Sequence, residues 1–409
     1  MNEFRRDGAW RVVLAACVGA AFGLTALPFY TLGVFAKPLA AEFAWSRSTI
    51  QSAITFAMFG VVSGAWLAGW LIDHYGARRV ALCSQVGLAV GFLGLTLQTG
   101  APWLWQANWF VCALLGVGTT PLTWTRGIAS WFVQRRGLAI GIALAGTGIT
   151  ALVAPPLVSA IVAAHGWRTG YVAIALGIVG LALPMVWFFF REKRPDAAAR
   201  QSTSSTATTD GMTLAQALRH PHFWLLVAAF AGIASAIAGV IPNLIPMLTD
   251  GGLTPAEAAR YASLLGLNVM LGRLIAGWLL DRYWAPAVAV ALLMPPVAAC
   301  LLLASHQWPA LAVALVGLAG GAEFDLIAYL CLRYFGTRNF GQIYGWQWAS
   351  FSLCAGFGPL AFGRIFDSTG SYQTALWVAA ALLVVGPLLL LALGRYPQPG
   401  AYQRRGVST

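Results

Sequence analysis

Charged side chains are scarce in this chain. Only 9% of its 409 residues are Asp, Glu, Lys or Arg, whereas 59% are hydrophobic and the mean hydropathy is +0.73. A soluble domain carries about 25% charged residues, so this chain lacks the polar surface that folding in water requires. The composition indicates an all-α protein that crosses a membrane many times.

Residues that bind metals or form disulfides are also few. The six cysteines all lie in apolar segments without C-x-x-C spacing, and the five histidines do not cluster. Such cysteines are typical of small buried side chains, so we expect no metal and no cofactor. The sequence contains no G-x-S-x-G, H-E-x-x-H or P-loop motif, which argues against an enzyme.

Acidic residues number 13 against 25 basic ones, which gives a net charge of +12. The basic residues fall in short runs between apolar segments, in EFRR, GARR, QRRG, REKR and YQRRG. This pattern is typical of the cytoplasmic loops of a multi-span protein rather than of a groove that follows phosphates. We therefore expect the lipid bilayer, and not a nucleic acid, as the partner of this chain.

Twelve apolar segments are long enough to span a bilayer. They cover residues 10–34, 48–72, 80–98, 105–131, 138–163, 170–190, 222–247, 259–280, 287–304, 310–333, 341–365 and 373–393. The polar stretch 191–221, rich in Ser, Thr and Ala at its centre, divides them six and six and is interpreted as a cytoplasmic linker. The predicted domains are an N-terminal bundle (1–190) and a C-terminal bundle with a short tail (222–409).

The distribution of basic residues predicts the orientation. With both termini and the linker in the cytoplasm, 18 Lys and Arg lie on the inner side and five on the outer side. This asymmetry is the positive-inside pattern. The first apolar run, 10–34, is too long for a signal peptide and is interpreted as an uncleaved span. The compact loops favour a bacterial inner membrane, and we expect a monomer.

The two halves of the sequence resemble each other. GWLIDHYGARR ends the second segment, and GWLLDRYWAP ends the eighth, 208 residues later. SWFVQRRGLAIGIA joins segments four and five, and LRYFGTRNFGQIYG joins segments ten and eleven. Two similar six-span halves around a linker predict a duplicated transporter fold with its binding site between the halves, near the membrane midplane.

The run from Gly69 to Arg79 resembles the loop 2–3 signature of the major facilitator superfamily. Its glycines permit a tight turn, and its carboxylate can meet helix N-termini or arginines. The resemblance implies gate contacts that break as the halves rock, although a charged turn that only fixes topology would have the same residues. The predicted gating residues are Asp73, Arg78, Arg79, Arg135, Arg136 and Asp281.

WFVQRRGLAIGIALAG (131–146) resembles the span 4–5 signature of the monocarboxylate transporter family, with Gln134 in place of its usual lysine. DGAWRV (7–12) resembles the start of that family's span 1, and LGRLIAG (271–277) its span 8. The resemblance implies that Arg273 binds a substrate carboxylate, as in the bacterial oxalate/formate exchangers. Those exchangers also carry a span 11 lysine, which GQIYGWQWASFSL lacks, so a monocarboxylate is favoured over a dicarboxylate.

An arginine near mid-bilayer is costly, by at least ~2.5–3.5 kcal/mol, and needs a partner. Arg273 lies eight residues before Asp281, and Asp325 lies eight before Arg333 on a span of the same direction, so the two lie at similar depth. Glu323 is about 200° around the helix from Asp325. We expect Asp325 to carry a coupled proton and Glu323 to pack against a neighbouring helix. A permanent salt bridge of Arg273 with either acid is the alternative.

The other residues expected to line the substrate site belong to spans that approach the centre of the superfamily's fold. They are Asn268, Phe29, Tyr30, Arg126, Tyr329, Tyr344, Trp346 and Gln347. The prediction is a secondary carrier of a small organic anion, coupled to a proton. The alternatives are a carrier of a neutral or larger solute such as a vitamin, an exporter of drugs or metabolites, and a sensor that does not transport.

Overall fold

The computed structural model describes residues 3–132, 136–192, 211–336 and 338–396. The helices of the first part are α1 (Glu3–Ala21), α2 (Leu27–Phe43), α3 (Arg47–Tyr75), α4 (Ala77–Leu95), α5 (Pro102–Gly116), η1 (Val117–Thr119), α6 (Pro121–Ala129), α7 (Arg136–Leu144), α8 (Gly146–Gly177), η2 (Ile178–Ala182) and α9 (Leu183–Phe189). Those of the second part are α11 (Leu214–Arg219), α12 (Pro221–Asp250), α13 (Pro255–Leu280), α14 (Ala285–Leu293), α15 (Pro295–Ala304), α16 (Pro309–Phe335), α17 (Phe340–Thr369) and α18 (Gln373–Leu391).

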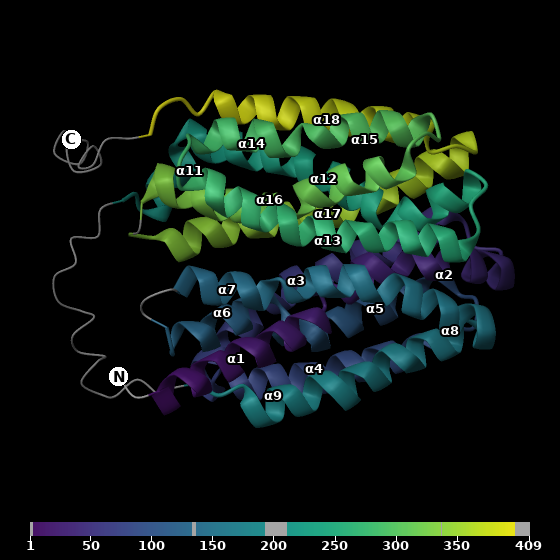
Figure 1. Ribbon diagram of the computed structural model, residues 1–409, viewed down its shortest axis with the longest axis horizontal. Helices are drawn as coiled ribbons and strands as arrows, with labels where there is room; N and C mark the ends of the chain where they lie inside the picture. The colour runs from purple at the N-terminus through teal and green to yellow at the C-terminus, as the bar shows by residue number, and fades with distance from the viewer. Residues whose placement is uncertain (1–2, 133–135, 193–210, 337, 397–409) are drawn as a thin grey trace.

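These helices form two bundles that lie side by side, α1–α9 in one and α11–α18 in the other (Figure 1). Within the described ranges, nine helices are long and apolar enough to cross a membrane. One of them, 139–189, holds two crossings that meet at Gly166, where φ is 81°. The pairs α1/α2 and α5/α6 supply the remaining two. The predicted all-α fold of twelve spans in two six-helix bundles is confirmed.

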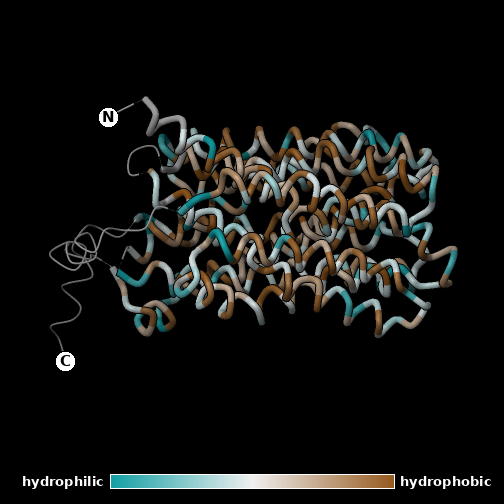
Figure 2. The backbone as a smooth tube through the Cα atoms, turned by 90° about the horizontal axis from the view of Figure 1, so that it is seen from below, coloured by the Kyte–Doolittle hydropathy of each residue, from teal (hydrophilic) through white to brown (hydrophobic). Residues whose placement is uncertain are grey.

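The two ends of the molecule differ in what they carry. The segments that flank the linker, which end at Glu192 and resume at Gly211, lie together with the end of α18 at one end, called here the linker end (Figure 1). The opposite end, which carries the α2–α3 turn, is called the far end. Hydrophobic residues occupy most of the length between them, and hydrophilic segments gather mainly toward the ends (Figure 2).

The first span differs from its predicted extent of 10–34. The helix stops at Ala21 and resumes at Leu27, one residue before Pro28, and then continues to Phe43. A proline at the second position of a helix costs little, because the N–H it lacks has no partner in the first turn. The chain therefore uses this proline to start a second helix rather than to kink one.

Two further prolines, Pro242 and Pro246, lie inside α12 without breaking it. Pro246 has no N–H, so it frees the carbonyl of Pro242 four residues earlier. Gln51 of α3, in the other bundle, directs its side-chain amide toward this carbonyl at 3.5 Å and donates to Asn243 at 2.9 Å. The backbone group that a proline frees is thus used in a contact between the halves.

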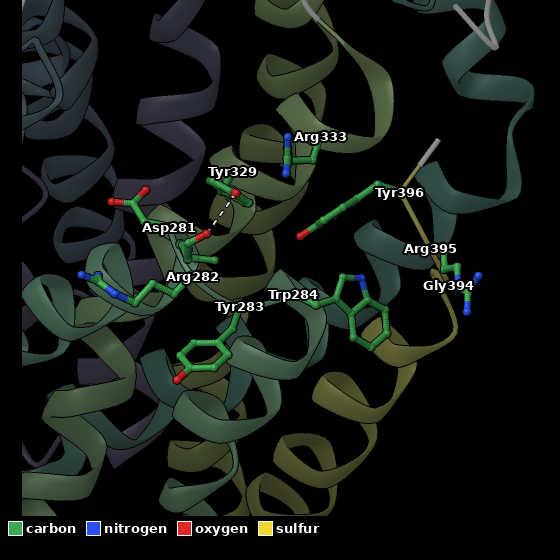
Figure 3. Close-up of a pocket in the computed structure, with 10 residues that line it drawn as sticks. Asp281, Arg282, Tyr283, Trp284, Tyr329, Arg333, Gly394, Arg395 and Tyr396 are labelled. Carbon is green, nitrogen blue, oxygen red and sulfur yellow. Dashed lines mark hydrogen bonds between the residues drawn. The ribbon is translucent and has the colours of Figure 1, made fainter. Parts of the chain in front are cut away.

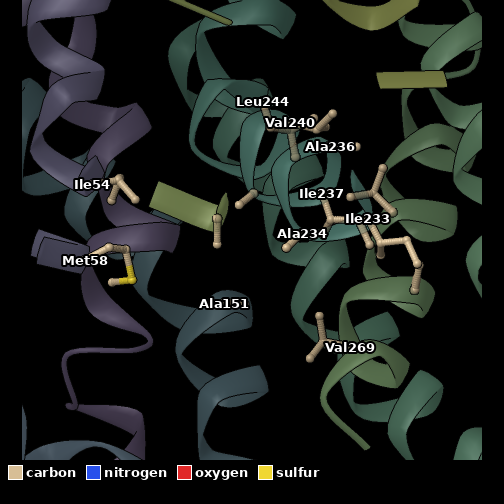
Figure 4. Close-up of a cluster of buried hydrophobic side chains, with 14 of the residues drawn as sticks. Ile54, Met58, Ala151, Ile233, Ala234, Ala236, Ile237, Val240, Leu244 and Val269 are labelled. Carbon is tan, nitrogen blue, oxygen red and sulfur yellow. The ribbon is translucent and has the colours of Figure 1, made fainter. Parts of the chain in front are cut away.

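The halves meet along three crossings, α3 with α17, α8 with α13 and α2 with α12. At the second crossing Gly148 faces Gly266 so closely that a Cβ on Gly266 would lie 2.2 Å from the nitrogen of Leu152. Apolar side chains of both halves surround the middle of α12, including Met58 of α3 and Val269 of α13 (Figure 4). The molecule is therefore closely packed between the halves from its middle toward the far end.

Candidate functional site

Arg273 of α13 lies next to a carboxylate inside the C-terminal bundle. Its Nε is 3.4 Å from Oδ2 of Asp325 on α16, which is the distance of an ion pair without the alignment of a hydrogen bond. The Arg273 side chain is 11% exposed and that of Asp325 is 34% exposed. The Nη1 of Arg273 has no hydrogen-bond partner among the described residues. Part of the guanidinium is therefore buried without a hydrogen-bond partner in the described part of the chain.

Glu323 lies two residues before Asp325 and is much more deeply buried, at 6% exposure. Its Oε2 has no hydrogen-bond partner in the part of the chain that the structure describes. The charges of Arg273 and Glu323 both act on the hydroxyl of Tyr30, which α2 contributes from the other half. The charges of Asp325 and Arg273 act on the hydroxyl of Tyr344 on α17. One cation, two acids and two phenols thus share this site, which draws on both halves.

Three predicted lining residues bind backbone of their own half. The Asn268 amide donates to the carbonyl of Leu264 at 2.8 Å, and the buried Gln347 donates to Phe223 at 3.0 Å. The hydroxyl of Tyr329 donates to the carbonyl of Leu280 at 3.0 Å. The Asn268 bond lies within one turn of α13, the Gln347 bond joins α17 to α12, and the Tyr329 bond joins α16 to the end of α13.

The other three predicted lining residues differ in exposure. Phe29 is partly buried against the apolar core of the molecule. Trp346 is 56% exposed on α17, and Arg126 is exposed in the last turn of α6. The charge of Arg273 therefore reaches the hydroxyls of Tyr30 and Tyr344, whereas the side chains of Trp346 and Arg126 are exposed.

Those predicted gating residues that the structure describes lie toward the linker end. Arg78 donates to the carbonyl of Trp187 at 2.6 Å, and its guanidinium lies over that ring, so it binds α9 of its own half. Glu192 accepts from the first N–H of α4, that of Ala77, at 2.8 Å. Arg79 is exposed on α4. Arg135 and the side chains of Asp73 and Arg136 lie outside the description that the structure gives.

Asp281 lines a cavity of about 810 Å³ at the linker end of the C-terminal half (Figure 3). The cavity lies between the ends of α13 and α16 and the segment after α18. Arg333 stands over the ring of Tyr396 at 4.6 Å, and the Tyr396 hydroxyl accepts from the N–H of Ala285. These contacts join elements of one half, so they do not depend on how the two halves meet.

Charged contacts between the halves lie instead at the far end. Asp250 of α12 forms ion pairs with Arg47 of α3, at 3.3 Å, and with Lys37 of α2, at 3.2 Å. Asp367 of α17 accepts hydrogen bonds from the backbone N–H groups of Arg47 at 2.8 Å and Ser48 at 2.9 Å. No role was predicted for these residues from the sequence. The available signal was a pair of acids at the outer ends of spans 7 and 11, facing basic residues on spans 1 and 2.

Comparison with known proteins decides the family. Residues 18–359 match the family model of the Major Facilitator Superfamily. The chain belongs to this superfamily. It is therefore a multi-pass membrane transporter and not an enzyme, and the predicted superfamily is confirmed.

Curated relatives agree with the narrower resemblance. Monocarboxylate transporter 11 of Homo sapiens is 26% identical over an alignment that covers 95% of this chain and 84% of that protein. The oxalate:formate antiporter of Oxalobacter formigenes is 23% identical, with 86% and 84% covered. Both lie within the families that the sequence resembles.

Solved structures show the same fold. The crystal structure of a D-xylose-proton symporter superposes with a TM-score of 0.70 at 14% identity, covering 93% of this chain and 97% of that one. A bacterial homologue of the human lysosomal transporter Spinster, in an inward-facing and occupied conformation, gives 0.68 at 17% identity, covering 96% and 97%.

Proposed function

We propose that this protein carries a small organic monocarboxylate across the membrane together with a proton. The observation that carries the proposal is the ion pair of Arg273 with Asp325, inside the bundle and beside a second acid. A planar guanidinium binds a carboxylate through two parallel hydrogen bonds. Arg273 is the cation of the site, and its buried Nη1, which has no hydrogen-bond partner among the described residues, is a donor that a substrate carboxylate would satisfy once the site opens.

The charges suggest how binding and proton uptake are coupled. Before binding, Arg273 and Asp325 neutralise each other. A substrate carboxylate that takes the guanidinium leaves Asp325 without its partner in a poorly hydrated place, where a lone negative charge is costly. One proton from the solvent binds to the Asp325 carboxylate and makes it neutral. One anion and one proton thus enter together, and the net charge of the site does not change.

Alternating access follows from the contacts between the halves. The far end is closed by the bonds of Asp250 and Asp367 to α2 and α3, and by the crossing of α8 with α13. We propose that these contacts break when the loaded carrier opens toward the far side. The gating residues at the linker end, with Asp73, Arg135, Arg136 and Asp281 among them, would then close the other side.

The orientation and setting belong to the same proposal. The excess of basic residues at the linker end favours a cytoplasmic linker and cytoplasmic termini. We propose a monomer in a bacterial inner membrane, built from an N-terminal bundle (1–190), a linker (191–221) and a C-terminal bundle (222–409).

A second function is favoured by the same ion pair. If Arg273 and Asp325 stay paired throughout the cycle, the pair is structural and the solute is neutral, such as a vitamin, or is an exported drug. The two candidates differ in one respect: only the first needs Arg273 to contact the solute.

Ligand-induced thermal stabilisation separates them. Purified wild type, Arg273→Gln and Arg282→Gln are melted with carboxylates, neutral vitamins and lipophilic cations. Arg282 is an exposed arginine beyond the end of the same helix and serves as the control. A ligand at 100 times its Kd stabilises by about 2.7 kcal/mol. Stabilisation by carboxylates that only Arg273→Gln loses supports the anion carrier, whereas stabilisation by neutral or cationic compounds alone supports the second function.

Proton coupling is tested in proteoliposomes. A proton gradient drives accumulation of the carboxylate by the wild type, and Asp325→Asn abolishes that dependence because an amide cannot take up the proton. Glu323→Gln is the matched variant on the same helix. If Glu323→Gln and not Asp325→Asn removes the dependence, the proton is carried by the deeper acid. If neither does, the coupling is not to protons through this pair.

A further inference from the structure

Four aromatic side chains form a continuous row along one face of α17. Phe340, Tyr344, Trp348 and Phe351 recur every three or four residues, so they lie above one another on the helix. The rings of Phe340 and Tyr344 are stacked at 5.5 Å and 7°, and those of Trp348 and Phe351 at 5.6 Å and 19°. Tyr344 and Trp348 are 6.0 Å apart. We call these four residues the aromatic row.

The aromatic row reaches the charged site through α16. Phe324 stands between the two acids in the sequence, and its ring lies 5.4 Å from Trp348 and 5.3 Å from Phe351. Tyr344, one turn closer to the linker end, is within electrostatic reach of Asp325 and Arg273. Phe324 directly precedes Asp325, so the aromatic row packs against the stretch of α16 that carries the ion-pair partner of Arg273.

The members of the row differ in burial, and the difference bears on their role. Phe351 is 5% exposed and belongs to the core. Phe340, Tyr344 and Trp348 are only partly buried, although they lie among helices of the bundle. Tryptophan and tyrosine offer flat faces that stack with another ring at centroid distances of 4.5–7 Å. Partly exposed faces next to a cation are a suitable surface for a planar ring that carries a carboxylate.

We propose that the substrate is an aromatic monocarboxylate, with its carboxylate on Arg273 and its ring against Tyr344 and Trp348. The inference rests on the proposed function and narrows the substrate class of the same site. Each ring stacking adds a preference of about three- to tenfold over an aliphatic group of equal size. Benzoate, phenylacetate and indole-3-acetate are the probes, and cyclohexanecarboxylate and cyclohexylacetate match two of them in charge and size but are not flat.

The experiment compares the Kd of each aromatic acid with that of its cyclohexyl counterpart by thermal shift. The wild type is expected to prefer the aromatic member by at least threefold. Trp348→Leu is expected to lower the ratio by about three- to tenfold, the contribution of one ring, while cyclohexylacetate still binds. Trp377→Leu is the control, because Trp377 lies on α18, outside the row, and is 55% exposed. It should leave the ratio unchanged.

The outcomes separate this inference from the function on which it rests. If the wild type binds cyclohexyl and aromatic acids equally well, the proposal of an aromatic substrate is refuted and the proposed anion carrier is unaffected. The aromatic row then serves packing alone. Failure of every carboxylate to bind overturns the proposed function itself. Melting without ligand shows whether Trp348→Leu folds. If it does not, Tyr344→Leu gives the same test from the neighbouring ring. A ratio that Tyr344→Leu leaves unchanged refutes the inference.

Discussion

Asp367 offers a direct measurement of what keeps the far end closed. Its carboxylate accepts the N–H groups of Arg47 and Ser48, the first two residues of α3, from the opposite half. Ser46 is the N-cap of α3; its hydroxyl accepts the backbone N–H of Thr49 and otherwise lies within hydrogen-bond distance of the hydroxyls of Ser48 and Thr49. The first two donors of this helix are thus satisfied by a residue of the other bundle. Asp367→Ala removes that partner without changing either helix.

The size of the effect follows from the local geometry. Loss of a side-chain cap costs about 0.5–2 kcal/mol, and loss of a negative charge at a helix N-terminus about 0.3–1 kcal/mol. The site is exposed, so water replaces part of both contributions. A net change of about 0.5–1.5 kcal/mol in favour of the separated halves, roughly half of the sum, corresponds to a shift of about 2- to 12-fold in the ratio of open to closed molecules.

Distances between spin labels measure that ratio. The labels are placed on cysteines introduced at Ala41 and Ala256, exposed positions near the far ends of α2 and α13, after the exposed Cys83 is replaced by serine. We expect Asp367→Ala to raise the long-distance population. Ser368→Ala is the control, because the Ser368 hydroxyl bonds only within its own helix turn. Equal distance distributions for wild type and Asp367→Ala would refute the reasoning.

Two further predictions concern other contacts of the fold. Gly266→Ala should separate α8 from α13, because the new Cβ would meet the backbone of Leu152. We expect a loss of stability of about 1–3 kcal/mol from overpacking and a longer distance between the labels. Gly277→Ala is the control and should produce neither effect, because a Cβ there would have nothing within 4 Å. Glu42, bonded to Arg168 at 2.7 Å and to Trp167, has its pKa lowered from 4.5 chiefly by these hydrogen bonds. Its contribution to stability is therefore present above pH 4.5 and lost below, so the melting temperatures of wild type and Glu42→Gln should converge on acidification; a constant difference would contradict this.

The fold was predictable because a bilayer allows only a few backbone structures to cross it. Apolar length and the placement of basic residues determine where a chain crosses, since lipid cannot satisfy exposed backbone. The same rules did not reveal that the first span would break before Pro28, or that α12 would continue through Pro242 and Pro246. The fate of a proline depends on which partner takes the carbonyl it frees. Here that partner is Gln51, nearly 200 residues earlier.

The depth of Arg273 and Asp325 in the membrane was predictable from the sequence, whereas the rotation of the helices that surround them was not. Counting residues from Asp281 and Arg333 placed Arg273 and Asp325 at one level of the membrane, and the structure pairs them. Their neighbours depend on how helices of the two halves turn toward each other, which a single helix sequence does not specify. That is why Tyr30 is beside the charges while Trp346 is at the surface, and why the bonds of Asp367 had no signature in the sequence.

The bond from Asp367 to Arg47 joins residues 320 positions apart. At 5–20 residues per second, a ribosome takes about 16–64 s to travel that distance. During this time α3 exists with its first two N–H groups bound to water, and α17 has not yet been made. A new molecule therefore acquires this contact only after α17 has been made, later than the residues that form the ion pairs of Asp250.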